Sequence, residues 1–467
     1  KTYEDEADNN LGDFVDKLDS GKPKDPNSPP FFFSSTHIEI YNSTFRLTDL
    51  NKEKPEILNF KNLNIAAGTF QILGPDVTTD IEALSMDSNI GINVEKLSTS
   101  FSYSKEQMKF DSLNIKTPKS NITGNIQFDY QREDLIYFMD KVQITANFVE
   151  SKVVLDEVNL LYDQFGTGKE VLFSGNISGI LNDLNIEQLF LISDNTGIRG
   201  DFNFTNLFSK EKPFELNADI KNITTSYYEL RSLMPNLLGK SLPSIFNRLG
   251  QFTIRGDAII TQTSINTRAN LNTVLGSSYL DLDLTEINDM DNARYKGFVS
   301  LIDFNLGRFV NNAKLGKATI DVNVEGKGFV SQNLNTEVFG EVYSAVFNDY
   351  EYNDVKVSGV LKDQLFDGSL ISNDENIKFN FDGLADFSDE ESSFNFNAFV
   401  EYADFKMLNF INDSVSVFKG DVSMDITGNS FESIEGNIQF SQTSYQNINN
   451  TYYFEDFSIV STFSKDS

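Results

Sequence analysis

The feature that most constrains this chain is a period of two in its hydrophobic residues, which recurs from Phe31 onward. Apolar and polar residues alternate through Val142–Phe148, and they do so again through Ala318–Val324. Side chains on a β-strand point to opposite faces in turn, so each run predicts a strand with one apolar and one hydrated face. The sequence therefore predicts an all-β fold in which many strands share one apolar face.

That face must be hidden from water, and helices offer little cover. Short helices are predicted at 131–139 and within 226–249, where Pro235 and Pro243 interrupt an apolar helical pattern. A closed barrel, two facing sheets or one sheet folded on itself could each hide the face. The residue pattern leaves these three solutions open, each with one or two short helical inserts between the strands.

A glycine followed by Asn or Asp and then by an apolar residue opens several of the predicted strands. Glycine within a strand marks a bulge, a bend or a close backbone approach, and repeated glycines let a long sheet keep curling. The irregular spacing of the pairs argues against a solenoid of fixed period. The pairs are Gly124-Asn125, Gly175-Asn176, Gly200-Asp201, Gly256-Asp257, Gly420-Asp421 and Gly436-Asn437.

The chain divides into a lead and one long region. Residues 1–30 are a polar lead with a short helix predicted at 8–18 and a proline-rich linker, and residues 31–467 are predicted to be one continuous β-repeat region with the helical insert near 226–249. The chain starts at Lys1 without a signal-peptide pattern, so we expect an internal fragment of a longer protein. No apolar run reaches the roughly 20 residues of a membrane-spanning helix.

Composition excludes several classes of function. The formal net charge of −31 disfavours binding to nucleic acid. The absence of cysteine and the single histidine, His37, leave no thiolate chemistry, no Cys-based zinc site and no multi-histidine metal site. We expect His37 to lie exposed on a strand, and we predict no enzyme activity, no metal and no cofactor.

The densest acidic groups fall at predicted hairpin ends, where solvated turns are the expected role. A carboxylate site of an extracellular β-helix enzyme acting on polysaccharide, or a weak Ca²⁺ site at 386–391, remains an alternative. The acidic residues are Asp289, Asp291, Asp386, Asp389, Glu390 and Glu391.

A continuous apolar face makes either a packed core or an apolar trough. Burying one methylene is worth about 0.8 kcal/mol, so a lipid with two long chains faces on the order of 20 kcal/mol in open water. A trough could remove most of that barrier. The side chains predicted to line it are Ile122, Ile126, Phe128, Ile144, Phe148, Phe202, Phe204, Ala258, Ile260, Ile320, Val322, Val324, Phe379, Phe381, Phe394, Phe396, Val422, Met424, Ile438 and Phe440.

Together with the glycine pairs, two further passages carry a resemblance to a known family. Residues 228–256 read YELRSLMPNLLGKSLPSIFNRLGQFTIRG, and residues 315–329 read LGKATIDVNVEGKGF. Over residues 35–460 the chain resembles the central β-repeat region of TamB (translocation and assembly module) proteins in the AsmA-like superfamily of bridge-like envelope proteins.

The resemblance implies both a fold and a function in envelope biogenesis. The implied fold is all-β, an elongated single curled sheet that forms an open, taco-like or solenoid-like groove with one or two short helical inserts. Such proteins lie in the periplasm of Gram-negative bacteria, held in the inner membrane by a segment that this chain lacks. Their hydrophobic groove is implicated in carrying phospholipid to the outer membrane. The alternative implied function is a scaffold or chaperone for outer-membrane protein assembly and secretion, with a TamA/BamA-family barrel as partner. An outer-membrane barrel is itself disfavoured, because the strands here vary in length and their aromatic residues are dispersed.

Overall fold

The computed structural model describes residues 29–461, apart from 49, 51–55, 210, 239–243, 290–291, 330–332, 388–391, 412–414 and 429–433. The described strands belong to one antiparallel sheet of 25 strands that is not closed into a barrel. This confirms the predicted all-β, single-sheet fold. The predicted helix at 8–18 and most of the proline-rich linker lie outside the described residues.

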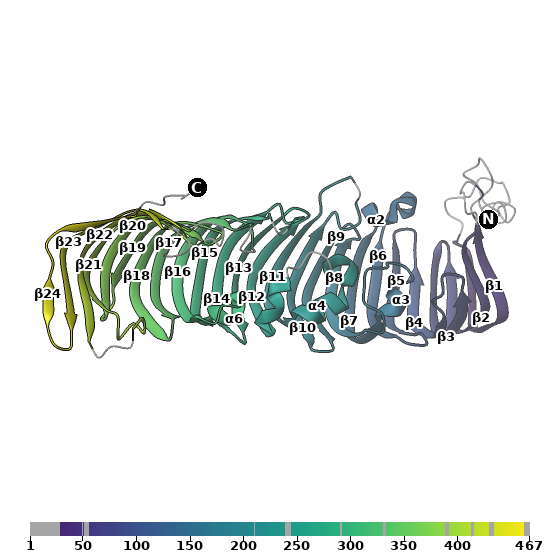
Figure 1. Cartoon of the computed structure of the whole chain (residues 1–467). Helices are drawn as coiled ribbons and strands as arrows, with labels where there is room; N and C mark the ends of the chain where they lie inside the picture. The colour runs from purple at the N-terminus through teal and green to yellow at the C-terminus, as the bar shows by residue number, and fades with distance from the viewer. Residues whose placement is uncertain are drawn as a thin grey trace, which may run out of the picture. The chain divides into compact units, whose positions relative to one another are not determined.

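Unit 1 comprises residues 1–222 and 229–240. From β1 to β10 each strand pairs with the next strand in the chain, and the strands lie side by side in chain order (Figure 1). The strands are β1 (Phe32–Thr48), β2 (Glu56–Leu73), β3 (Asp76–Ser88), β4 (Val94–Tyr103), β5 (Gln107–Lys116), β6 (Asn121–Asp129), β7 (Gln143–Val154), β8 (Glu170–Ile180), β9 (Asp183–Ser193), β10 (Thr196–Thr205) and β11 (Glu215–Ser226), whose last residues belong to unit 2.

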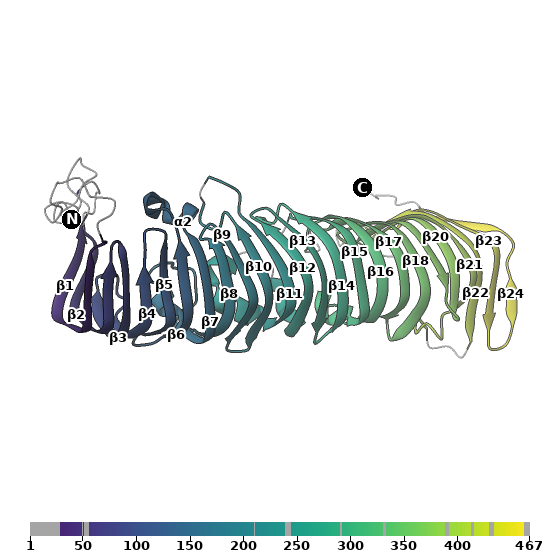
Figure 2. The same cartoon turned by 180° about the vertical axis from the view of Figure 1, so that it is seen from behind.

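Unit 2 comprises residues 223–228 and 241–467. Its strands follow the same plan of neighbour pairing, as the view from behind also shows (Figure 2). The strands are β12 (Gln251–Thr261), β13 (Ser264–Thr273), β14 (Gly276–Thr285), β15 (Arg294–Asn305), β16 (Leu315–Lys327), β17 (Asn335–Phe347), β18 (Tyr350–Lys362), β19 (Leu365–Asn373), β20 (Ile377–Asp386), β21 (Ser393–Asp404), β22 (Ser416–Thr427), β23 (Glu435–Asn447), β24 (Thr451–Tyr453) and β25 (Phe457–Ser461).

The described helices are short and sit in the connections between strands. The helix predicted at 131–139 is present as η1 (Arg132–Tyr137) followed by α2 (Phe138–Lys141). The predicted insert at 226–249 holds α4 (Tyr227–Leu233), α5 (Pro235–Leu238) and η2 (Ser244–Leu249), and Pro235 starts α5 as a helix-opening residue. Two helices were not predicted, namely α3 (Leu155–Val158) and α6 (Leu306–Val310).

Two of the Gly-Asn and Gly-Asp pairs, Gly200-Asp201 and Gly124-Asn125, have a structural role at β-bulges. Gln188 has a positive φ of 53°, and its backbone N–H donates to Asp201 Oδ1 on the next strand at 2.7 Å. Ser112, with a φ of 52°, donates in the same way to Asn125 Oδ1 at 2.8 Å. At both places the bulge lies on the strand that precedes the glycine. The residue after the glycine caps it, and this satisfies a backbone donor that the bulge frees.

Candidate functional site

The apolar residues of unit 2 form continuous rows across the sheet. Residues paired directly across antiparallel strands point to the same face, so the strand register fixes which side chains are neighbours. The face that these rows define is called the inner face. One row is Gly256, Ala269, Leu280, Val299, Val322, Gly340, Val357, Leu370, Phe381, Ala398, Val422, Phe440 and Phe457.

The next row of the inner face is also free of charge. It adds width to the apolar surface on every strand from β12 to β23 and on β25. Its residues are Ala258, Thr267, Leu282, Gly297, Val324, Val338, Gly359, Gly368, Gly383, Phe396, Met424, Ile438 and Ile459.

Unit 1 has an inner face of the same kind. Two apolar rows cross this face. The shorter row runs from Phe101 through Phe110 and Ile126 to Phe202. Although the bulges shift the register, they leave both rows apolar. The longest row crosses β1 to β9 through Phe33, Ile72, Val77, Tyr103, Met108, Phe128, Ile144, Gly179 and Leu184.

All twenty side chains predicted to line a trough lie on the inner face of their own unit. Ile144, Phe202, Ala258 and Val322 are buried, and the other sixteen are half-buried. A packed core would bury large apolar side chains almost completely. The inner face buries small residues such as Ala258 and Ala385, and it leaves phenylalanines such as Phe381 partly open. Contact between these residues and a lipid stays a prediction.

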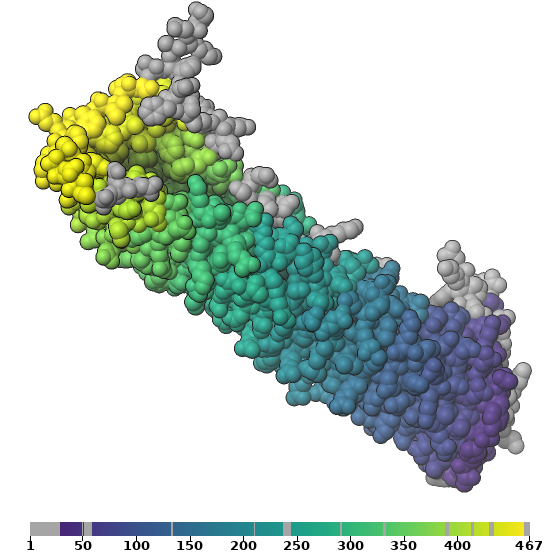
Figure 3. All heavy atoms as spheres, turned by 60° about the horizontal axis from the view of Figure 1, so that its bottom comes forward, coloured from purple at the N-terminus to yellow at the C-terminus, as the bar shows by residue number. Residues whose placement is uncertain are grey.

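Aromatic rings lie beside a column of glycines on the inner face of unit 2. Gly359, Gly368 and Gly383 follow one another on β18, β19 and β20. Beside the column, the Phe381 ring lies 6.2 Å from Phe366 and 4.9 Å from Phe396, measured between ring centroids. The space-filling view shows a hollow at the C-terminal end of unit 2, edged by the yellow atoms of the last strands (Figure 3).

The two faces differ in charge. Burial raises the pKa of Tyr295 and also that of Tyr352, so both inner-face phenols stay neutral. The outer face carries the charge, for example in the Arg268–Asp281 ion pair at 3.2 Å and the Lys296–Glu325 pair at 2.7 Å. Such exposed pairs contribute little stability, but they keep the outer face hydrated.

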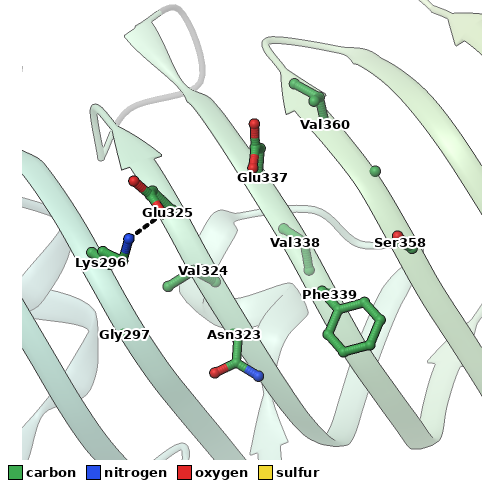
Figure 4. A pocket seen from close by; sticks show the side chains of 11 residues that line it. Lys296, Gly297, Asn323, Val324, Glu325, Glu337, Val338, Phe339, Ser358 and Val360 are labelled. Atoms are coloured by element: carbon green, nitrogen blue, oxygen red, sulfur yellow. Dashed lines mark ion pairs between the residues drawn. The ribbon is translucent and has the colours of Figure 1, made fainter.

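A shallow depression of about 370 Å³ lies on the outer face over β15 to β18 (Figure 4). Lys296, Glu325 and Glu337 stand around it, and the ring of Phe339 at its edge is 66% exposed. Ligand sites enclose a few convergent polar groups within an apolar pocket. This depression is open to solvent and its lysine is already paired with Glu325, so the inner face is the better candidate.

The remaining polar candidates do not converge on a site. His37 is exposed on β1 as predicted, and the hydrogen bond that its Nε2–H donates to Glu39 Oε1 at 3.0 Å raises the pKa of His37. Asp289 lies in a turn and Asp386 at the end of β20, while Asp291, Asp389, Glu390 and Glu391 fall outside the described residues. Within the described ranges, no group of three or more His, Asp or Glu residues is arranged to hold a metal ion.

In the part of the chain that the structure describes, no helix combines the length and apolarity needed to cross a membrane. No family model matches the chain, and comparisons with curated proteins and with solved structures find no relative.

Proposed function

We propose that this chain carries phospholipid along its inner face, as part of a bridge-like protein of the TamB group that spans the periplasm between inner and outer membrane. The observation that carries the proposal is the set of uncharged rows that cross all successive strands of unit 2 from β12 to β23 without a break. Acyl chains can move along such a surface without meeting a charge.

Energetics favour acyl chains as the occupant. A half-buried phenylalanine such as Phe381 still has apolar area to bury, and each methylene laid against it gains about 0.8 kcal/mol. Burial of an unpaired headgroup charge costs several kcal/mol, so the headgroup belongs at the open side of the curled sheet. A surface of this kind needs no catalytic group, and the lack of enzyme activity stays a prediction.

Matched carboxylates on the two faces test the proposal. Phe381→Asp places a charge on the inner face, whereas Asn380→Asp places the same charge on the neighbouring outer-face position. We expect the inner variant to retain several-fold less phospholipid after purification, measured by mass spectrometry, and the outer variant to match the unmodified chain. Circular dichroism of both variants checks that the sheet is intact, and equal lipid retention in two folded variants would refute the proposal.

A second candidate function rests on the sheet edges. β1 pairs with β2 and β25 pairs with β23, so each unit presents an edge strand. The exposed apolar residues of β25 include Val460, which is 68% exposed. Exposed edges can template the strands of a client, as a scaffold for outer-membrane proteins of the TamA/BamA pathway would require.

Photo-crosslinking separates the two functions. A photoreactive residue at Ile126, Val322 or Phe381 should form adducts with acyl chains if the inner face carries lipid. Protein adducts alone, with no lipid at any of the three positions, would favour the scaffold.

A further inference from the structure

A segment of unit 1, called the strap, comprises α3 and the turn that follows it, residues 155–169. Successive strands run in opposite directions, so their turns fall on two opposite rims of the sheet. The strap joins β7 to β8 on rim A, together with the turns at 89–93, 117–120 and 194–195. Rim B holds the turns at 104–106, 130–142 and 181–182, and also residues 206–209, which follow β10.

The strap reaches from rim A to rim B. The ring of Tyr162 on the strap meets the ring of Phe208 on rim B edge-on, with centroids 6.1 Å apart. The two rims are separated by the length of a strand, and β9, with 11 residues, is about 36 Å long if extended. Tyr162 therefore reaches Phe208 only because the sheet curls and the strap crosses the opening between the rims. Phe208 is held on its own rim, since its backbone N–H donates to Asn182 Oδ1 at 3.0 Å.

Contacts with the inner face place the strap over that face. Leu155 of the strap, Val171 of β8 and Leu233 of α4 form a buried apolar cluster. The inner-face residues Phe173 and Leu191 pack against this cluster. The strap therefore covers the inner face at β8 and β9.

The α4–α5 segment braces the strap. Gly166 N–H donates to the Leu233 carbonyl at 2.9 Å, and Asn236 Nδ2 donates to the Asp163 carbonyl at 3.1 Å. Gly166 is required at this contact, because a Cβ there would lie 1.9 Å from the Ser232 carbonyl oxygen.

The strap is fastened differently at its two ends. On rim A, Glu157 accepts hydrogen bonds from Thr117 Oγ1 at 2.6 Å and from Ser120 Oγ. The Lys119 ammonium adds an ion pair to Asp156 at 3.0 Å. The contact with rim B is the Tyr162–Phe208 ring pair, which can separate without leaving a polar group unpaired.

We propose that the strap is a gate, hinged on rim A, that must part from Phe208 before a lipid can pass β8 to β10. This inference rests on the proposed lipid function. Acyl chains lie on the inner face while a polar headgroup stays at the opening, because its burial is costly. The strap stands across that opening, so a headgroup cannot slide past while Tyr162 touches Phe208.

The absence of cysteine makes the gate directly testable. In Tyr162→Cys/Phe208→Cys the two thiols are the only ones in the chain, and a short cleavable bis-maleimide joins strap to rim B. The matched control, Asn348→Cys/Asn409→Cys, joins two turns of unit 2 that already hydrogen-bond to each other at 3.0 and 3.1 Å and lie on one rim. The assay is transfer of a fluorescent phosphatidylethanolamine between donor and acceptor vesicles, with lipid retained at equilibrium measured in parallel.

We expect the linked strap to slow transfer by about tenfold or more, as a locked lid does. Retained lipid should not change, cleavage of the linker should restore the rate, and the linked control should transfer normally. Unchanged transfer with the strap fully linked and lipid still retained overturns the gate and leaves the lipid function standing. If neither the unlinked chain nor the control retains lipid, both the proposed lipid function and the proposed gate are refuted.

Discussion

At the scale of single residues, the inner face depends on glycines that no other residue can replace without strain. Gly297 has a φ of +145°, and a Cβ built on it would lie 2.0 Å from the Asp281 carbonyl oxygen on the neighbouring strand. Backbone and neighbour thus both exclude a side chain. Such positions let adjacent strands approach closely where the sheet curls.

We predict that Gly297→Ala lowers the free energy of unfolding of unit 2 by about 2–4 kcal/mol, the combined cost of a disfavoured backbone conformation and a steric overlap. Chemical denaturation followed by circular dichroism measures the change. The control is Gly197→Ala on β10, where a Cβ meets nothing within 4 Å and stability should stay within about 0.5 kcal/mol. Equal losses in both variants would contradict the steric explanation.

The face on which many side chains lie could be predicted from the sequence. Alternation alone assigned Val322 and Phe381 to the apolar face, because a period of two is a direct consequence of strand geometry. The positions of the bulges could not be predicted from the sequence, because residues such as Gln188 and Ser112 are not typical of a positive φ. Their conformation is set by a cap on the next strand, which only the register reveals.

At the scale of elements, a buried carboxylate joins the turn between β19 and β20 to the start of β18 in unit 2. Asp374, between β19 and β20, is buried and accepts hydrogen bonds from the Tyr350 hydroxyl and from the backbone N–H groups of Asn353 at 2.9 Å and Asn376 at 2.8 Å. Burial, together with the hydrogen bond to Asp374, raises the pKa of Tyr350 from its ordinary 10 to about 12. The phenol is therefore held protonated against the carboxylate.

This tie predicts a pH dependence. The unfolded chain loses the Tyr350 proton near pH 10 and the folded chain near pH 12, so the stability from this tyrosine is fully present below pH 10 and is lost as pH rises to 12. We expect Tyr350→Phe to cost about 1–2 kcal/mol at pH 8, and the cost to shrink between pH 10 and 12. Denaturation at each pH measures it, with the exposed Tyr453→Phe as control, and a cost that stays constant up to pH 12 would contradict the assignment.

The helices show where sequence reasoning at this scale ends. The insert at 226–249 was predicted because leucines recur at helical spacing between prolines. The four residues of α3 are too few to give a helical period, so neither α3 nor the strap was foreseen. The strap is positioned by tertiary contacts with Leu233 and Phe208, and no local pattern encodes those.

At the scale of the whole molecule, stability is expected to be local. Within each unit the strands pair with their neighbours in the chain, so a disturbance has only neighbouring interfaces through which to spread. Repeat proteins with such nearest-neighbour coupling lose structure segment by segment. The sequence indicated this plan through its many similar strands, but it could not place the boundary between the two units.

Leu408 offers the sharpest test of this local stability. It is fully buried in the connection between β21 and β22, while its neighbour Met407 is 52% exposed. Leu408→Ala should cost about 2–4 kcal/mol through the cavity it leaves, and Met407→Ala should cost little. Hydrogen exchange followed by mass spectrometry should then show faster exchange in β20 to β23 and unchanged exchange in β12 to β14, because the loosened strands share no pairing with the distant ones. Uniformly faster exchange across unit 2 would mean that this unit opens as one cooperative body, and it would contradict the expectation that stability is local.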